Sequence, residues 1–481
     1  MSLGKVRRIH FVGIGGTGMC GLAEVCLNLG YEVSGSDLAR GDATERLTIL
    51  GARVAFGHRA DQVSGADLVV VSSAIRRSNP EYREAMRLQI PMLKRGEMLA
   101  EIMRLKTGIA IAGAHGKTTT TSLIGHVLSS AGLDPTVVVG GRLRAAGSNA
   151  RLGAGDYLVA EADESDGSFL DLNPTLAVVT NIDLEHLDHY SGLPDIQEAF
   201  LRFLRKVPFY GVAIVCGDDP NIREVIARVP KRCLTYGFSA ENHIVASDPT
   251  YDGMTSRFQI RYLDEPAHPV EVSLPGRHNV LNATAAYAVA REVGVRVDTI
   301  IEAMRTFGGV GRRFEIRSEA GGVIHVDDYG HHPTEVNAVL KTARAVWPDR
   351  RLVTLFQPHR FTRTRALHRE FGGVLMNTDI LLLAEVYPAG ERPLPGVSSS
   401  LILAAVRSQN HPPEAHIVAD SDEASRIARG VLKPGDILLT LGAGDVYRWG
   451  DRIMNDRARD ATDAPCAVDR MSSERSSLPM G

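Results

Sequence analysis

Short apolar runs of strand character alternate with longer apolar stretches of helical character along most of the chain. Runs that read as helices, at 22–29, 97–105 and 119–130, follow some of the strands. The strand-like runs lie at 6–14, 31–36, 67–72, 109–112, 156–161, 176–180, 323–326, 352–356 and 436–441. This alternation predicts an α/β fold with mostly parallel sheets.

Length and composition divide this pattern into domains. A chain of 481 residues is too long for one core and indicates about three domains. We predict a Rossmann-like domain over 1–106, a P-loop domain over 107–312 and a second Rossmann-like domain over 313–454. The glycine-rich stretch 308–313 is the expected hinge. From 455 to 481 the chain is polar, and its few apolar residues show no helical or strand periodicity, so a disordered tail is predicted there.

Charge and cysteine content narrow the function classes. The net charge of −3 gives no electrostatic case for nucleic acid or a membrane surface. No apolar run approaches the ~20 residues of a membrane span, and no signal peptide is recognised. The five cysteines are scattered without metal-ligand spacing, which indicates reduced thiols. We therefore expect a soluble cytoplasmic protein.

The strand-like run 109–112 ends in a glycine-rich loop that is typical of phosphate binding. Gly113 and Gly116 flank the turn, and Lys117 and Thr118 follow at the start of a helix. Backbone N–H groups and the helix N-terminus hold phosphate, the lysine reaches terminal phosphate oxygens, and the Thr118 hydroxyl suits magnesium. The usual Walker spacing fails, because Ile111 stands at its first-glycine position. A turn that binds nothing is the alternative, although a lysine there opposes the helix dipole.

A second glycine-rich turn follows the first strand. The stretch 13–19 contains Gly-x-Gly-x-x-Gly, and the acidic Asp37 ends the next strand about 20 residues on. Such a turn can bind any pyrophosphate. The pattern therefore fits a nicotinamide dehydrogenase, a protein that binds another phosphorylated ligand, or a turn with a purely structural role.

Acids and amides follow the strands of the predicted second domain. Glu161 ends one strand and is the best candidate for a magnesium ligand, and a solvated acidic loop is the alternative for the whole stretch 161–166. His186 is either a ligand or a capping residue. Asn279 is placed to contact a base edge, and Asn282 fits an ordinary polar helix face.

Polar groups also follow two strands of the predicted third domain. Asp328 ends one strand, and His359, Arg360 and Arg363 follow another. A domain closing over a cleft would present them to a ligand, whereas a helix start with surface arginines would look similar.

These motifs together resemble the Mur ligase family. Six stretches in the same order carry the likeness, which spans nearly the whole chain apart from its tail: 10–19, 113–119, 161–166, 276–279, 327–333 and 357–360. At Ala114 the family more often has threonine, which matters little for a loop that binds through its backbone. The resemblance implies a UDP-sugar domain, a central ATPase and an amino-acid domain.

The resemblance also implies the reaction and its residues. ATP would phosphorylate the lactyl carboxylate of UDP-N-acetylmuramate, and the amine of L-alanine would attack the acyl phosphate. The implied UDP-sugar ligands are Gly15, Gly16, Thr17, Gly18, Met19, Asp37, Ser72 and Ser73. The implied ATP ligands are Gly113, Ala114, His115, Gly116, Lys117, Thr118, Thr119, Asn279, Arg313 and Asp328. Thr118 and Glu161 would hold one magnesium ion, and His186 would hold a second. Lys117, His359, Arg360 and Arg363 are the expected catalytic groups.

Further expectations concern modification and assembly. Some relatives carry a carbamylated lysine after the histidine, but no lysine precedes Lys206 in the corresponding segment 195–206, so no such modification is predicted. A monomer or weak homodimer is expected. Three alternatives stay open: a ligase that recycles an intact peptide onto the same UDP-sugar, a nicotinamide oxidoreductase, and a P-loop ATPase without ligation.

Overall fold

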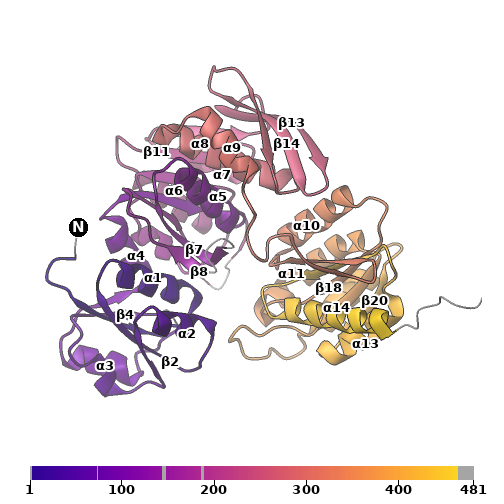
Figure 1. Cartoon of the computed structure of the whole chain (residues 1–481), viewed down its shortest axis with the longest axis horizontal. Coiled ribbons are helices and arrows are strands. Elements are labelled where there is room, and N and C mark those ends of the chain that lie inside the picture. Colours follow the sequence, from indigo (N-terminus) through magenta and orange to yellow (C-terminus); the bar gives the residue numbers. More distant parts are fainter. Residues whose placement is uncertain (1–2, 73, 144–147, 186–188, 464–481) are drawn as a thin grey trace, which may run out of the picture. The chain divides into compact units, whose positions relative to one another are not determined.

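The computed structural model describes residues 3–72, 74–143, 148–185 and 189–463 (Figure 1). The chain divides into two compact units, residues 1–311 and 312–481. The described residues form three sheets, two in the first unit and one in the second. Helices and strands alternate, so the predicted α/β class with mostly parallel sheets is confirmed.

The first sheet is parallel, with strand order β3-β2-β1-β4-β5 in the described residues. Its strands are β1 (Arg8–Val12), β2 (Glu32–Asp37), β3 (Arg53–Phe56), β4 (Leu68–Val71) and β5 (Met92–Lys94). The helices of this part are α1 (Thr17–Asn28), α2 (Asp42–Ile49), α3 (Pro80–Arg87) and α4 (Arg95–Met103). The order reverses at β1, which places the glycine-rich turn after β1 at the ligand-binding edge of the sheet.

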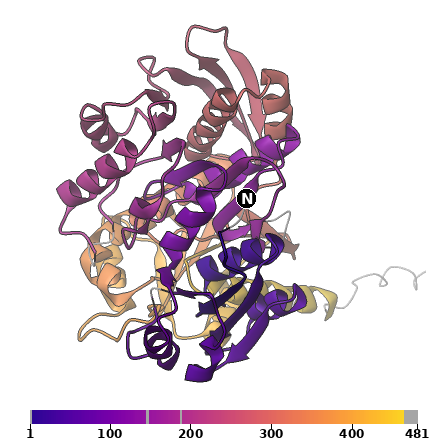
Figure 2. The same cartoon turned by 90° about the vertical axis from the view of Figure 1, so that its left-hand side faces the viewer.

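The second sheet has the order β15-β14-β13-β12-β11-β10-β6-β9-β7-β8 over the described strands. They are β6 (Thr107–Ala112), β7 (Thr136–Leu143), β8 (Ser148–Arg151), β9 (Tyr157–Glu161), β10 (Leu176–Val179), β11 (Val212–Cys216), β12 (Cys233–Gly237), β13 (Ile244–Asp252), β14 (Thr255–Tyr262) and β15 (His268–Val272). Strands from β13 to β7 are parallel, whereas β13, β14 and β15 pair antiparallel and extend from one end of the sheet (Figures 1 and 2).

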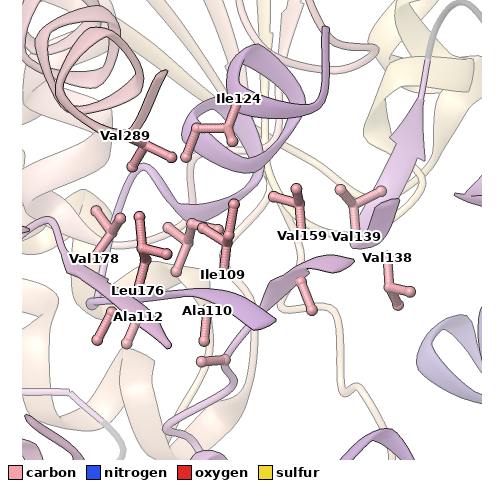
Figure 3. Close-up of a cluster of buried hydrophobic side chains, with 14 of the residues drawn as sticks. Ile109, Ala110, Ala112, Ile124, Val138, Val139, Val159, Leu176, Val178 and Val289 are labelled. Atoms are coloured by element: carbon pink, nitrogen blue, oxygen red, sulfur yellow. The ribbon is translucent and has the colours of Figure 1, made fainter. Parts of the chain in front are cut away.

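Helices cover this sheet and bury its central strands. They are α5 (Lys117–Ser130), α6 (Leu193–Arg205), α7 (Pro220–Ile226), α8 (Arg277–Val293) and α9 (Val297–Arg305). Every residue of β6 from Ile109 to Ala112 is fully buried, as expected for a parallel strand covered on both faces. In Figure 3, Ile124 of α5 and Val289 of α8 lie on the same side of the strands as Val178 of β10. The phosphate loop therefore stands on a rigid base.

The sheet of the second unit has the order β16-β17-β21-β18-β19-β20 within the described chain. Only the β16–β17 pair is antiparallel there. The strands are β16 (Glu315–Ala320), β17 (Val323–Asp328), β18 (Leu352–Phe356), β19 (Ile380–Ala384), β20 (Glu414–Val418) and β21 (Ile437–Leu441). The helices are α10 (Pro333–Val346), α11 (Phe361–Val374), α12 (Ser399–Arg407), α13 (Ser421–Val431) and α14 (Val446–Asp463).

The prediction of a disordered tail from residue 455 is wrong for its first part. Helix α14 continues to Asp463, and Ile453 and Met454 are buried in the core of the second unit. Polar residues of the helix then pair with α13 through Arg429, which contacts Asp456 and Asp460. Residues 464–481, and Cys466 with them, lie outside the described residues.

Two further observations bear on the expectations from composition. Cys20, Cys26, Cys216 and Cys233 are free thiols. Among the described helices, none combines the length and the apolar character that crossing a membrane requires.

Candidate functional site

The phosphate loop occupies residues 113–116, between β6 and α5. Gly113 has φ of +132° and Gly116 has φ of +82°, both in the region that favours glycine. A Cβ on Gly113 would lie 2.1 Å from Thr180 Oγ1, and a Cβ on Gly116 would lie 2.6 Å from Asn282 Oδ1. Both glycines are therefore required by backbone conformation and by close packing.

Residues after β10 hold the loop in place. Thr180 Oγ1 donates to the His115 carbonyl at 2.6 Å, and Asn181 Nδ2 donates to it at 3.0 Å. The His115 N–H donates to Asn181 Oδ1 at 2.8 Å, and His115 Nε2 lies 3.1 Å from Asp183 Oδ2. The loop is thus preformed, and the N–H groups of Ala114 and His115 are bonded to Asn181, just after β10. The N–H groups in the first turn of α5 have no intrahelical acceptor, so that turn suits an anion.

Lys117 is the first residue of α5, and its side chain folds back over the loop. Nζ donates to the Gly113 carbonyl at 2.6 Å, the Ala114 carbonyl at 3.3 Å and Glu164 Oε1 at 2.8 Å. Burial by itself would lower the pKa of Lys117, but nearby carboxylates, Glu164 foremost, raise it above its ordinary value. The ammonium is therefore charged and held in place over the loop.

Glu164 is the residue of this site that the sequence prediction missed. Its side chain is 3% exposed, and it lies one residue after Asp163, which pairs with Arg95 at 3.1 Å. The prediction treated 161–166 as one acidic cluster and selected only the strand-end residue. The available signal was the acidic pair directly after the apolar strand, because a carboxylate that becomes buried there requires a cation.

The predicted magnesium ligands in the described residues lie close to Lys117. Thr118 is buried in the first turn of α5, and Glu161 is paired in register with Ile111 at the end of β9. The charge of Glu161 contributes to the raised pKa of Lys117, which places this carboxylate beside the loop. A hydroxyl and a carboxylate are hard oxygen donors of the kind that magnesium prefers, so this donor set fits the metal. His186, the third predicted ligand, lies outside the described residues.

The amides of α8 connect to the loop from another side. Asn279 Nδ2 donates to the Pro275 carbonyl at 2.8 Å, and Asn282 Nδ2 donates to Asn279 Oδ1 at 3.1 Å. Thr120 Oγ1 donates to Asn282 Oδ1 at 3.2 Å. The interpretation of Asn282 as a polar helix face is wrong, because Asn282 is buried and joins α8 to α5.

The glycine-rich turn of the first sheet is also built around hydrogen bonds. The Gly15 N–H donates to Asp37 Oδ2 at 2.8 Å, so this carboxylate fixes the turn itself. Gly16 caps α1, which begins at Thr17. Met19 is a core residue with 1% exposure, and its N–H donates to the Gly16 carbonyl at 2.9 Å, so neither its side chain nor its N–H is open to a ligand.

Gly18, Ser72 and Ser73 were also predicted to bind a ligand at this turn. Gly18 lies in the first turn of α1, and a Cβ there would meet Arg95. Ser72 follows β4, and its N–H donates to the Val12 carbonyl at 3.1 Å. Ser73 lies outside the described residues.

In the second unit, Asp328 organises the end of β17. Its Oδ2 accepts from the Phe314 N–H and its Oδ1 from the Gly330 N–H, both at 2.7 Å. Burial raises the pKa of Asp328 to about 6, against the lowering effect of the Arg313 charge. The Arg313 guanidinium lies 5.3 Å from the centre of the Tyr329 ring. The two predicted nucleotide contacts of this unit are therefore neighbours.

The predicted catalytic groups of the second unit form a cluster at the start of α11. Arg363 Nη1 lies 3.4 Å from His359 Nδ1, and the His359 ring stacks on Tyr387 and contacts His331. Burial, with the Arg363 charge next, lowers the pKa of His359 to about 4. Arg360 has φ of +72°, a strained conformation of the kind found at functional sites.

His331 and Tyr387 were not predicted as members of this cluster. His331 belongs to the stretch 327–333 that carried the family resemblance, yet only Asp328 was selected from it. Tyr387 follows β19 and meets His359 through a β-bridge, a contact that has no sequence signal.

Comparison with known proteins gives consistent matches along the chain. Residues 8–107 match the family described as "Mur ligase family, catalytic domain", 111–290 the "Mur ligase middle domain", and 312–444 the "Mur ligase, glutamate ligase domain". The chain is 50% identical over 458 residues to UDP-N-acetylmuramate–L-alanine ligase of Geotalea daltonii, covering 95% of this chain and 99% of that one.

Two further relatives extend the comparison. The ligase of the same name from Nitratidesulfovibrio vulgaris is 53% identical over 450 residues, covering 94% of this chain and 99% of that one. The crystal structure of UDP-N-acetylmuramate-alanine ligase from Thermotoga maritima matches with a TM-score of 0.80 and 28% identity, covering 94% and 99% of the two chains.

Proposed function

The chain belongs to the Mur ligase family, and from that premise we propose that it is an ATP-dependent ligase joining L-alanine to the lactyl carboxylate of UDP-N-acetylmuramate. The reaction would proceed through an acyl phosphate and serve peptidoglycan precursor synthesis. Relatives of that activity match at 50–53% identity over 94–95% of the chain. The oxidoreductase alternative explains only the first glycine-rich turn.

The observation that carries the proposal is the placement of Lys117 over the loop at the N-terminus of α5. Condensing a carboxylate with an amine is uphill in water, so a phosphate leaving group has to be installed first. Attack of a carboxylate on ATP brings two anions together, and a fixed cation at that point lowers the barrier. Lys117 is such a cation, held by two loop carbonyls and Glu164.

The residues beside the loop have distinct roles in this proposal. Thr118 and Glu161 would hold one magnesium ion and His186 a second, and both ions would neutralise phosphate charge. Asn279, from α8, would contact the adenine. Asp37 and the turn that it fixes would bind the UDP-sugar.

The cluster at the start of α11 would act on the amino-acid side. His359, with a pKa of about 4, is neutral at physiological pH. It is therefore a hydrogen-bonding group there rather than a cation. Arg360 and Arg363 supply positive charge for a substrate carboxylate. Arg313 and Asp328 would contact ATP from the same unit.

We extend the proposal to domain roles and location. Residues 1–106 would bind the UDP-sugar, 107–312 ATP, and 313–454 the amino acid. Use of ATP is consistent with a cytoplasmic enzyme, and a monomer or weak homodimer is the state to test by sedimentation.

Phosphate release tests the function directly. The purified chain is supplied with ATP, magnesium and UDP-N-acetylmuramate, and one amine is added at a time. We expect release that depends on both the UDP-sugar and L-alanine and is lost in Lys117→Ala. Release only with an alanyl-glutamyl-diamino acid peptide would assign the recycling ligase instead. Release without need of the UDP-sugar would leave a bare ATPase and refute the ligase.

A further inference from the structure

Arg312 is the first residue of the second unit, and it lies directly before Arg313, one of the predicted ATP contacts. Val310 belongs to the buried core of the first unit, so a single residue, Gly311, separates that core from Arg312 along the chain. Residues 311–314 form a turn that belongs to no helix or strand, because β16 begins only after them. Regular secondary structure therefore does not fix the position of Arg313.

The Arg312 side chain forms a hydrogen bond from each of its three nitrogens. Nε donates to Asp327 Oδ2 at 3.0 Å, Nη1 to the Gly444 carbonyl at 3.1 Å and Nη2 to the Gly442 carbonyl at 2.6 Å. The carboxylate of Asp327 is fully buried, and the guanidinium carbon lies 4.4 Å from the centre of the Tyr447 ring. One side chain therefore ties the turn to β17 and to the loop that follows β21.

The backbone on both sides of Arg313 is bonded to the end of β17. The Tyr329 N–H donates to the Arg312 carbonyl at 2.8 Å. The Phe314 N–H donates to Asp328 Oδ2 at 2.7 Å. The direction in which Arg313 leaves the turn is therefore set by the conformation of its two neighbours.

That conformation is unfavourable without the surrounding contacts. Arg312 has φ of +59° and Phe314 has φ of +47°, in the left-handed region that non-glycine residues rarely adopt. Such a backbone persists only where other contacts impose it. Without the three bonds of its guanidinium, Arg312 would return to negative φ, which would redirect the chain at Arg313.

The direction of Arg313 matters for the proposed reaction. A cation stabilises developing charge on phosphate only when it is already in position, and small displacements cost much of the rate. Each nitrogen of Arg312 already has an acceptor within the second unit, so this arginine is suited to hold the turn rather than a ligand.

We propose that Arg312 is a positioning residue of the ligation: its guanidinium imposes the turn that directs Arg313 toward ATP. The inference rests on the proposed function and adds to it a residue that acts without touching the nucleotide.

Phosphate release by the full chain, with ATP, magnesium, UDP-N-acetylmuramate and L-alanine, tests this role. Arg312→Lys keeps the charge but loses the three directed bonds, so we expect kcat to fall between about tenfold and a hundredfold. Arg351→Lys is the matched control, because Arg351 binds Asp436 and the Val431 carbonyl in the same manner at the opposite edge of the sheet. The control should change kcat less than about twofold, even where both variants lower the melting temperature equally.

A double variant separates positioning from stability. If Arg312 acts through Arg313, adding Arg312→Lys to Arg313→Ala should lower kcat further by less than about twofold. Asp327→Asn weakens the pair with Arg312 at nearly constant volume and serves where the lysine variant does not fold. It should also lower kcat, again without a further loss in Arg313→Ala.

Two results would overturn the inference while leaving the ligase intact. One is an unchanged kcat in Arg312→Lys or in Asp327→Asn. The other is a double variant in which the separate losses multiply. Failure of the unaltered chain to release phosphate with UDP-N-acetylmuramate and L-alanine would refute the proposed function itself, and this inference with it.

Discussion

Replacing Gly116 by alanine tests whether the phosphate loop has only one accessible shape. At φ of +82°, the left-handed conformation costs a non-glycine residue ~1–2 kcal/mol. Its Cβ would lie 2.6 Å from Asn282 Oδ1, which accepts a buried hydrogen bond from Thr120. Displacing Asn282 breaks that bond at a cost of ~1–3 kcal/mol, so the total is roughly 2–5 kcal/mol.

Gly132→Ala separates the two contributions. Gly132 follows the C-terminal end of α5 with φ of +76°, and no atom lies within 4 Å of a Cβ there. This variant should therefore lose only ~1–2 kcal/mol.

Hydrogen exchange of the α5 amides measures both losses as local opening free energies, and ATP titration follows the site. We expect Gly116→Ala to exchange faster than Gly132→Ala and to bind ATP more weakly. Equal exchange in the two variants, with unchanged ATP affinity, would refute a rigid contact between the loop and Asn282.

Three further predictions concern charge. Glu164→Gln should destabilise the ligand-free first unit by roughly 3 kcal/mol, because it leaves Lys117 charged in a largely buried site; an unchanged melting temperature would contradict this. Burial lowers the pKa of His325 to about 4, so the neutral imidazole is the folded form. The free energy of unfolding of the second unit should therefore fall as pH drops from 6.5 to 4. Urea titrations at several pH values should show a smaller fall over this range in His325→Gln. Chelation of magnesium should abolish phosphate release. Glu161→Gln should raise the magnesium concentration needed for half-maximal release about tenfold or more. An unchanged concentration would count against Glu161 as a ligand.

Local sequence signals were sufficient for the loop but not for the residue that completes it. The run from Ile109 to Ala112 is apolar, short and bounded by glycines, so strand, turn and helix follow from neighbouring residues. The contact between Lys117 and Glu164 joins residues 47 apart. It depends on how the chain turns after β9, where Gly167 has φ of +74°. Composition shows that acids are present there, but only the turn decides which of them reaches the loop.

The end of α14 shows the same limit for secondary structure. Residues 455–463 are polar, and their composition alone is typical of a disordered segment. Tertiary contacts provide the missing stability, because Arg457 donates to the carbonyls of Leu432 and Gly321. Side chains that look solvated in the sequence are thus bound to the rest of the unit.

The carboxylate beside Lys117 has a physical explanation. A largely buried cation without a partner costs several kcal/mol, so Lys117 requires an anion while no substrate is present. Glu164, whose side chain is 3% exposed, provides that anion and holds the ammonium over the loop. In the proposed reaction phosphate would compete with this carboxylate, which would lower affinity but leave the geometry unchanged between the empty and the bound state. Transition-state stabilisation depends on groups that need not reorganise when the reaction occurs. Glu164 would therefore serve catalysis without touching the reacting atoms.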